Sequence, residues 1–218
     1  GKKIAYVSNE MGQYKIWIYD THTEKSEKIL KHGHRIKQIN DYTYPVLEWH
    51  PSGKILTIIT EREGGLKLIH YIADEDKFAE RNLLYFDKIL DFDYSSDGTS
   101  LVFSAVKDSK TDIYIYDIAS ATHKQLTNDI ADDLNPSFIK NTKLILFSSN
   151  RISDSLLTSR GYSDQFDLYT VDYTNKTPQI KRLTTTNYAN ETKPFPASNN
   201  EYFYLNDKNG IRNLYNGR

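Results

Sequence analysis

Short runs of alternating apolar and polar residues recur along the whole chain. Four of them read IWIYD, LIHYI, IYIYD and LYTVD, and they are rich in β-branched and aromatic residues. Turn sequences such as Pro51-Ser52-Gly53 and Ser96-Asp97-Gly98 separate the runs. No window of a dozen residues keeps the i, i+3, i+4, i+7 spacing of an amphipathic helix. The pattern therefore predicts an all-β protein.

The runs belong to a repeating unit. An apolar or aromatic pair marks each copy: Ile4/Tyr6, Leu56/Ile58, Leu101/Phe103, Ile145/Phe147 and Tyr202/Tyr204. The copies start near residues 1, 53, 98, 142 and 199. In four copies a second apolar run follows 15 residues after the start, at Ile16, Leu68, Ile113 and Leu214. In the fourth copy the equivalent Leu168 lies 26 residues after the start, which indicates an 11-residue insertion. A period of this length built from strands is typical of a β-propeller.

Each full copy contains four predicted strands, the number in one propeller blade. An aromatic residue four positions before each later start belongs to the innermost strand, and we expect it to be buried between blades: Trp49, Tyr94, Phe138 and Phe195. The chain reads as three strands, three complete blades and three strands. We therefore expect a partial propeller of four to five four-stranded antiparallel blades. It is either a segment of a longer chain or one whose incomplete blades pair with a second copy. A β-sandwich, the alternative, does not repeat a fixed offset.

Whole-chain composition narrows the class of protein. The 218 residues are consistent with a single domain spanning 1–218. A net charge of -1 and a pI near 6.7 argue against nucleic acid as the main partner. No apolar stretch reaches the length of a transmembrane segment, and cysteine is absent, which excludes disulfides and thiol chemistry.

No catalytic motif is present, so we expect no enzymatic activity, metal or cofactor. The chain lacks the nucleophile elbow, the phosphate loop, the dinucleotide fingerprint and the zinc-protease motif. His32 and His34 could approach one metal ion, but a third ligand at motif spacing is missing. Oxygen ligands of the kind that calcium prefers gather in one loop, at Asp129, Asp132, Asp133 and Asn135. This loop lacks the Gly and Glu of an EF-hand, so we expect a solvated turn.

The insertion gives the sharpest prediction of a binding site. It lies within residues 151–165, between the second and third strands of its blade. That connection and the links between blades, residues 31–44, 127–134 and 184–192, emerge at one face of a propeller. Functional residues concentrate on such loops. The candidate binding residues combine donors, acceptors and an aromatic ring: Arg151, Asp154, Arg160, Tyr162 and Asp164.

Two stretches resemble a known family. GKKIAYVSNEMGQYKIWIYDTHTEKSEKIL and YSSDGTSLVFSAVKDSKTDIYIYDIASATHKQLT are similar to the WD-like propeller repeats of TolB-type periplasmic proteins. The resemblance implies a non-enzymatic platform in the bacterial cell envelope that binds a protein or a cell-wall glycan.

Two alternatives remain open. The same repeat occurs in prolyl-oligopeptidase-like serine peptidases, so the chain could be a regulatory propeller whose catalytic domain lies elsewhere. A propeller enzyme such as a lyase or glycosidase is the third possibility. It would need carboxylates or a metal at the central channel, and the inner strands offer only Glu48, Asp91 and Asp93.

Overall fold

The computed structural model describes residues 2–10, 13–32, 44–62, 64–152 and 162–218. These residues form β-strands and no helix, which confirms the predicted all-β class. The strands are β1 (Lys3–Glu10), β2 (Gln13–Asp20), β3 (Lys25–His32), β4 (Val46–Trp49), β5 (Ile55–Arg62), β6 (Gly65–Ile72), β7 (Lys77–Asn82), β8 (Lys88–Tyr94), β9 (Ser100–Lys107), β10 (Lys110–Asp117), β11 (Thr122–Gln125), β12 (Asp133–Phe138), β13 (Leu144–Arg151), β14 (Tyr162–Asp172), β15 (Ile180–Arg182), β16 (Glu191–Pro196), β17 (Tyr202–Asn206) and β18 (Asn213–Gly217).

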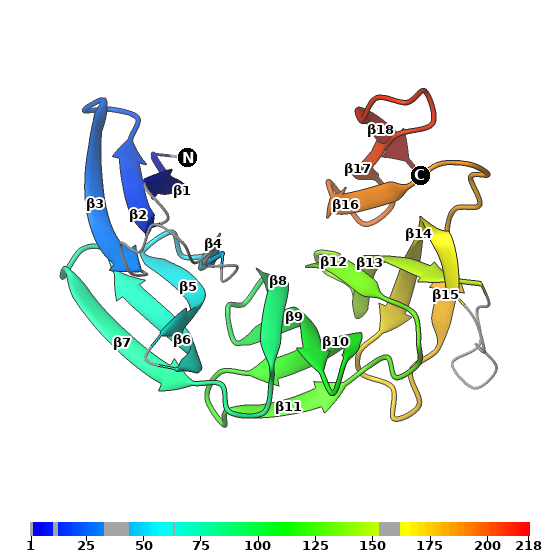
Figure 1. Ribbon diagram of the computed structural model, residues 1–218, viewed down its shortest axis with the longest axis horizontal. Coiled ribbons are helices and arrows are strands. Elements are labelled where there is room, and N and C mark those ends of the chain that lie inside the picture. The colour runs from blue at the N-terminus through cyan, green and yellow to red at the C-terminus, as the bar shows by residue number, and fades with distance from the viewer. Residues whose placement is uncertain (1, 11–12, 33–43, 63, 153–161) are drawn as a thin grey trace. The chain divides into compact units, whose positions relative to one another are not determined.

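The strands pair in sequence order into five small antiparallel sheets, the blades (Figure 1). Blade 1 is β1–β3, blade 2 is β4–β7, blade 3 is β8–β11, blade 4 is β12–β15 and blade 5 is β16–β18. Blades 2, 3 and 4 have four strands, and blades 1 and 5 have three. This arrangement confirms the predicted propeller blades, three of them complete and two partial.

The chain divides into two compact units. Unit 1, Gly1–Leu84, contains blades 1 and 2, and unit 2, Tyr85–Arg218, contains blades 3, 4 and 5. In unit 1 the two blades pack through buried aliphatic residues, including Ile16 and Ile18 of blade 1 and Leu56 and Ile58 of blade 2. Trp49 is half-buried against the same cluster.

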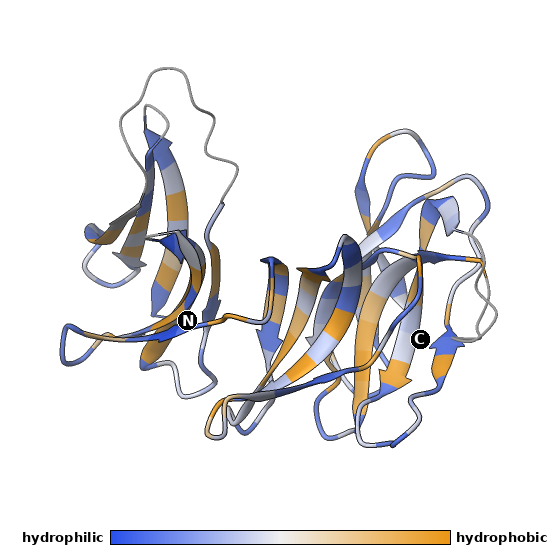
Figure 2. Ribbon diagram, turned by 60° about the horizontal axis from the view of Figure 1, so that its bottom comes forward, coloured by the Kyte–Doolittle hydropathy of each residue, from blue (hydrophilic) through white to orange (hydrophobic). Residues whose placement is uncertain are grey.

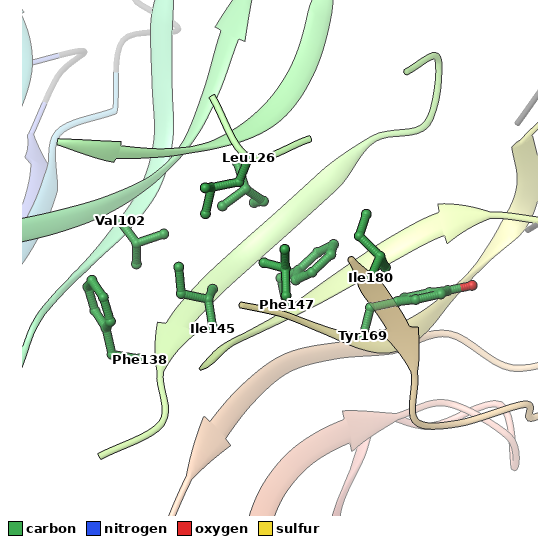
Figure 3. Close-up of a cluster of buried hydrophobic side chains, with 9 residues drawn as sticks. Val102, Leu126, Phe138, Ile145, Phe147, Tyr169 and Ile180 are labelled. Atoms are coloured by element: carbon green, nitrogen blue, oxygen red, sulfur yellow. The ribbon is translucent and has the colours of Figure 1, made fainter. Parts of the chain in front are cut away.

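Unit 2 holds its blades together with two apolar layers. Alternating strand residues supply them, as the bands of opposite hydropathy along the strands show (Figure 2). Val102 and Leu126 of blade 3 meet Phe138 and Phe147 of blade 4 in the first layer (Figure 3). In the second layer Leu146 of blade 4 packs with residues of blade 5. Because each strand contributes to both faces of its sheet, both faces of blade 4 are buried.

The expected burial of the inner-strand aromatics is confirmed for Tyr94 and Phe138 but is wrong for Phe195, which is 63% exposed. In blades 3 and 4 the aromatic residue pairs with the first apolar marker of its copy, for example Phe138 with Ile145. In blade 5 the equivalent marker Tyr202 pairs with Pro196 instead, because the β16–β17 turn is shorter: the paired residues are 6 positions apart here and 7 apart in blade 4. A shift of one residue moves a side chain to the opposite face of its sheet, so Phe195 points away from the buried side.

Candidate functional site

The connections at one end of the unit 2 blades form the candidate site. β12 starts at Asp133, which pairs with Ser149 near the end of β13. Arg151 at the end of β13 pairs with Tyr162 at the start of β14. Because neighbouring strands are antiparallel, the β13–β14 connection and the links between blades emerge at the same end. We define the loop end as the described residues 127–132, 152, 162–166, 183–190 and 207–212.

Large apolar side chains are exposed on each of these connections. The exposed fractions are 50% for Ile130, 57% for Ile152, 63% for Tyr162, 89% for Tyr188 and 71% for Ile211. Single exposed apolar residues are ordinary on a protein surface. Five of them lie on the connections at one end of the unit, beside exposed polar residues.

Tyr188 is held in an unusual conformation on a well-anchored link. Its φ is 61°, a left-handed value that is a steric outlier for a bulky residue. Its backbone N–H donates to Gln165 Oε1 at 3.2 Å. The neighbouring Asn190 accepts from the Phe166 N–H at 3.2 Å and donates its own N–H to Asp207 Oδ1 at 2.6 Å. The surrounding bonds thus fix a strained backbone that places an aromatic ring in solvent, a combination found at ligand-binding sites.

Arg151 lies beneath the loop end as a fully buried cation. One guanidinium nitrogen, Nη2, donates to both carboxylate oxygens of Asp133 at 2.6 and 2.7 Å, and Nε donates to Ser149 Oγ at 2.9 Å. Nη1 lies 3.1 Å from Asp129 Oδ2, an ion-pair contact without hydrogen-bond geometry. Burial raises the pKa of the Asp133 carboxyl, and the guanidinium opposes that rise. The Arg151–Asp133 ion pair joins β13 to β12 within blade 4. The contact of Arg151 with Asp129 joins this blade to the link from blade 3.

Aromatic rings complete the surroundings of Arg151. Its guanidinium carbon lies 5.6 Å from the ring centre of Phe147 and 5.5 Å from that of Tyr169. The Tyr169 hydroxyl donates to the Arg151 carbonyl at 3.0 Å. Cation–π contacts of this kind gain strength away from water. Arg151 therefore fixes the end of β13, where the β13–β14 connection begins.

A third carboxyl group, that of Asp112, is buried at the same junction. It accepts hydrogen bonds from Gln125 Nε2 at 3.0 Å and Thr127 Oγ1 at 3.2 Å. Burial, followed by the charge of Asp133, raises its pKa from 3.8 to about 7. This side chain was not singled out in the sequence, where it sits in the ordinary strand sequence KTDIYIYD.

The inner strands of unit 2 are linked by polar side chains. Asn135 Nδ2 donates to Asp91 Oδ2 at 2.9 Å, and Asn135 Oδ1 accepts from the Lys193 N–H at 3.3 Å. Asp93 accepts from the Ser137 hydroxyl at 2.8 Å. Two of the three carboxylates that an enzyme would need at the inner strands, Asp91 and Asp93, thus join neighbouring blades.

Of the predicted binding residues, Tyr162 and Asp164 are exposed at the loop end. Arg151 was expected within the loop, but it ends β13 and its side chain is buried. Asp154 and Arg160 lie outside the described residues. The binding role of the set stays a prediction. The sequence predicts a long link at residues 184–192, but nothing in the composition of this link distinguishes Tyr188 from its neighbours.

The predicted solvated turn at residues 129–135 is wrong for two of its members. Asp129 is 6% exposed and Asp133 is fully buried, because Arg151 supplies a counter-charge from a residue 18 positions after Asp133 in sequence. Asp132 alone of the three acids is exposed. Within the described residues, no three His, Asp or Glu side chains are placed to hold a metal ion. His34 and the His32 side chain lie outside them.

Comparison with known proteins identifies the fold of the chain. No family model and no curated protein matches the sequence. Among solved structures, TolB from Acinetobacter baumannii superposes with a TM-score of 0.71 and 19% identity, covering 98% of this chain and 49% of TolB. A TolB from Agrobacterium tumefaciens gives 0.68 and 18%, covering 97% of this chain and 72% of that one. Prolyl oligopeptidase B from Galerina marginata gives 0.64 and 15%, covering 99% and 32%.

These similarities define the chain as a β-propeller protein. The predicted resemblance to TolB-type propellers is confirmed for the fold. The chain spans about half the length of the Acinetobacter TolB that it matches. The part of the chain that the structure describes contains no helix with the length and apolar character to cross a bilayer.

Proposed function

We propose that this protein is a non-enzymatic propeller platform that binds a protein partner through the loop end of unit 2. The observation that carries the proposal is Tyr188, an 89% exposed aromatic residue in a left-handed conformation on a link tied to β14. Tyrosine is enriched at protein interfaces because it offers a large amphipathic contact surface at a low entropic cost. Ile130, Ile152 and Tyr162 are further exposed apolar side chains of the loop end that would contribute to binding.

The similarity to TolB propellers supports placing this platform in the bacterial cell envelope. Asp164 and, by sequence, Asp154 and Arg160 would supply the polar rim around the apolar residues. A cell-wall glycan is the alternative partner on the same surface. The buried Arg151 would fix the start of the β13–β14 connection without touching the partner.

The experiment compares Tyr188→Ser with a control of equal exposure. Leu84 is also 89% exposed, but it belongs to unit 1 and lies outside the loop end. Partners captured from bacterial envelope extract by the unchanged protein are identified, and the affinity of the purified partner is then measured for each variant. We expect Tyr188→Ser to weaken binding about tenfold or more, as the loss of a central aromatic contact does, and Leu84→Ser to leave it unchanged. Equal binding by all three proteins would refute the assignment of the surface.

A deletion tests the β13–β14 connection separately. Shortening it between Ile152 and Tyr162 is expected to leave the thermal melt within a few degrees of the unchanged protein, because loop-closure entropy depends weakly on length. Partner binding is expected to weaken. A collapsed melt would show that the connection stabilises the fold, and unchanged binding would remove it from the site.

A second function is favoured by the match to prolyl oligopeptidase B, whose propeller shares this fold. The chain would then be the regulatory propeller of a serine peptidase, with the catalytic domain supplied by another segment. The purified chain is expected to show no hydrolysis of peptide, ester or glycoside substrates under either function. Turnover that is lost on changing one residue of this chain would contradict both.

A further inference from the structure

The junction between blades 3 and 4 contains more buried acid than base. Asp112 is 1% exposed, and it lies beside Asp133 and Asp129, which are buried as well. These three carboxyl groups come from β10, from β12 and from the link between the two blades. Arg151 from β13 is the buried cation that pairs with this group, and its contacts go to Asp133 and Asp129.

Asp112 receives only neutral hydrogen-bond donors in the described structure. They are the Gln125 side-chain amide, the Thr127 hydroxyl and the Asp129 backbone N–H. Neutral donors stabilise a carboxylate less than a cation does. With all three acids ionised, the junction would carry two uncompensated negative charges away from water, which is unfavourable.

Blade 4 contains the same arrangement with one decisive difference. In blade 3 the Ile113 N–H donates to Thr127 Oγ1, and in blade 4 the Leu168 N–H donates to Thr184 Oγ1, both at 2.9 Å. Asp112 and Asp167 are the residues that precede these two N–H groups. Asp167 pairs with the guanidinium of Arg182, whereas the residue in the place of Arg182 in blade 3 is Gln125.

We propose that Asp112 is a proton-operated switch that sets how tightly blades 3 and 4 are joined. At acidic pH the carboxyl group is neutral, and Arg151 balances one of the two remaining charges. As the pH rises through about 7, the carboxyl loses its proton, and repulsion from Asp133 and Asp129 weakens the junction. The proton goes to solvent.

The change of stability with pH follows from the direction in which the pKa of Asp112 is shifted. Burial and Asp133 raise the pKa of Asp112, so the folded state binds a proton that the unfolded chain has already released between pH 4 and pH 7. The stability contributed by this proton is complete below the unfolded pKa, and it is lost as the pH rises through the folded pKa. The link 127–132 carries Ile130 of the loop end, so the switch would also alter partner binding. That consequence rests on the proposed function.

The test needs no partner, so it can fail independently of the proposed function. Hydrogen exchange is measured by NMR at the amides of Ile113 and Leu168 between pH 6 and pH 9, and the rates are corrected for the intrinsic pH dependence. We expect protection at Ile113 to fall about tenfold or more over this range, while protection at Leu168, beside the paired Asp167, stays constant. Constant protection at Ile113 would overturn the proposal.

Two variants make the test specific. Asp112→Asn removes the titrating group, and Gln125→Arg installs the cation that blade 4 has at this position. Both are expected to make protection at Ile113 independent of pH. A pH dependence that persists in either folded variant would assign the effect to another group and overturn the proposal. If Asp112→Asn does not fold, Gln125→Arg provides the same comparison with the carboxyl group retained.

Discussion

Replacing Arg151 with methionine is the most direct test of how unit 2 is held together. Methionine has a similar length and is apolar, so the change removes the charge while keeping most of the volume. It leaves Asp133 and Asp129 buried without their counter-charge, and it removes the hydrogen bond to Ser149. Breaking a buried ion pair by removing one partner costs about 3–5 kcal/mol. We expect a loss of stability in this range.

Arg182→Met is the matched control within the same unit. Arg182 pairs with Asp167, but its side chain is 30% exposed, so water compensates part of the lost interaction. Because the Asp167 carboxylate is itself buried, we expect a cost of about 2 kcal/mol, between the values for exposed and fully buried pairs. The double variant Arg151→Met with Asp133→Leu removes the cation and one of its two carboxylate partners, and it is expected to recover part of the loss of the single variant.

The assay is urea unfolding followed by two signals. Both tryptophans, Trp17 and Trp49, belong to unit 1, so tryptophan fluorescence reports that unit, while far-UV circular dichroism reports the whole chain. A loss of about 4 kcal/mol with a slope of about 2 kcal/mol per molar urea lowers the midpoint by about 2 M. We expect this shift in circular dichroism for Arg151→Met. A loss below about 1 kcal/mol, or a loss equal to that of Arg182→Met, would refute the reasoning.

Three further outcomes follow from the packing. Tyr94→Ala is expected to cost about 3–5 kcal/mol in urea unfolding, because Tyr94 is 5% exposed and leaves a cavity. A loss well under 1 kcal/mol would contradict the inner-strand register. Phe195→Ala is expected to change stability by less than about 0.5 kcal/mol, since its ring is 63% exposed, and a large loss would show that it packs. Gly53→Ala is expected to lower the stability of unit 1 by about 1 kcal/mol, because Gly53 has a φ of 69°; an unchanged tryptophan melt would contradict this.

Much of the fold could be predicted because propeller blades are local structures. Each strand pairs with its neighbour in sequence, so alternation of side chains and short turns are sufficient to define a sheet. The 15-residue offset located the third strand of each blade, and the insertion after β13 was recognised as an interruption of that offset. The same locality explains why the number of strands in each blade was predicted correctly.

The candidate site was only partly predictable. Tyr162 and Asp164 were found because they lie in an insertion, which must leave the sheet. Tyr188 was missed because its importance depends on a backbone angle and on side chains from β14 that hold its link. Arg151 was assigned to the surface, because a charged residue beside an insertion normally lies in solvent.

The sequence by itself thus determined the repeat, the all-β class, the strands of each blade and the end from which the long connections emerge, because these depend on neighbouring residues. Only the tertiary structure decided which charges are buried and which faces are covered. Arg151 is buried because Asp133 and Asp129 lie within reach across two strands and a link. Phe195 is exposed because the shorter β16–β17 turn moves the pairing by one residue, which places Pro196 on the buried face and Phe195 on the other. The pKa of Asp112 depends on packing between separate blades, which no periodicity within one blade encodes.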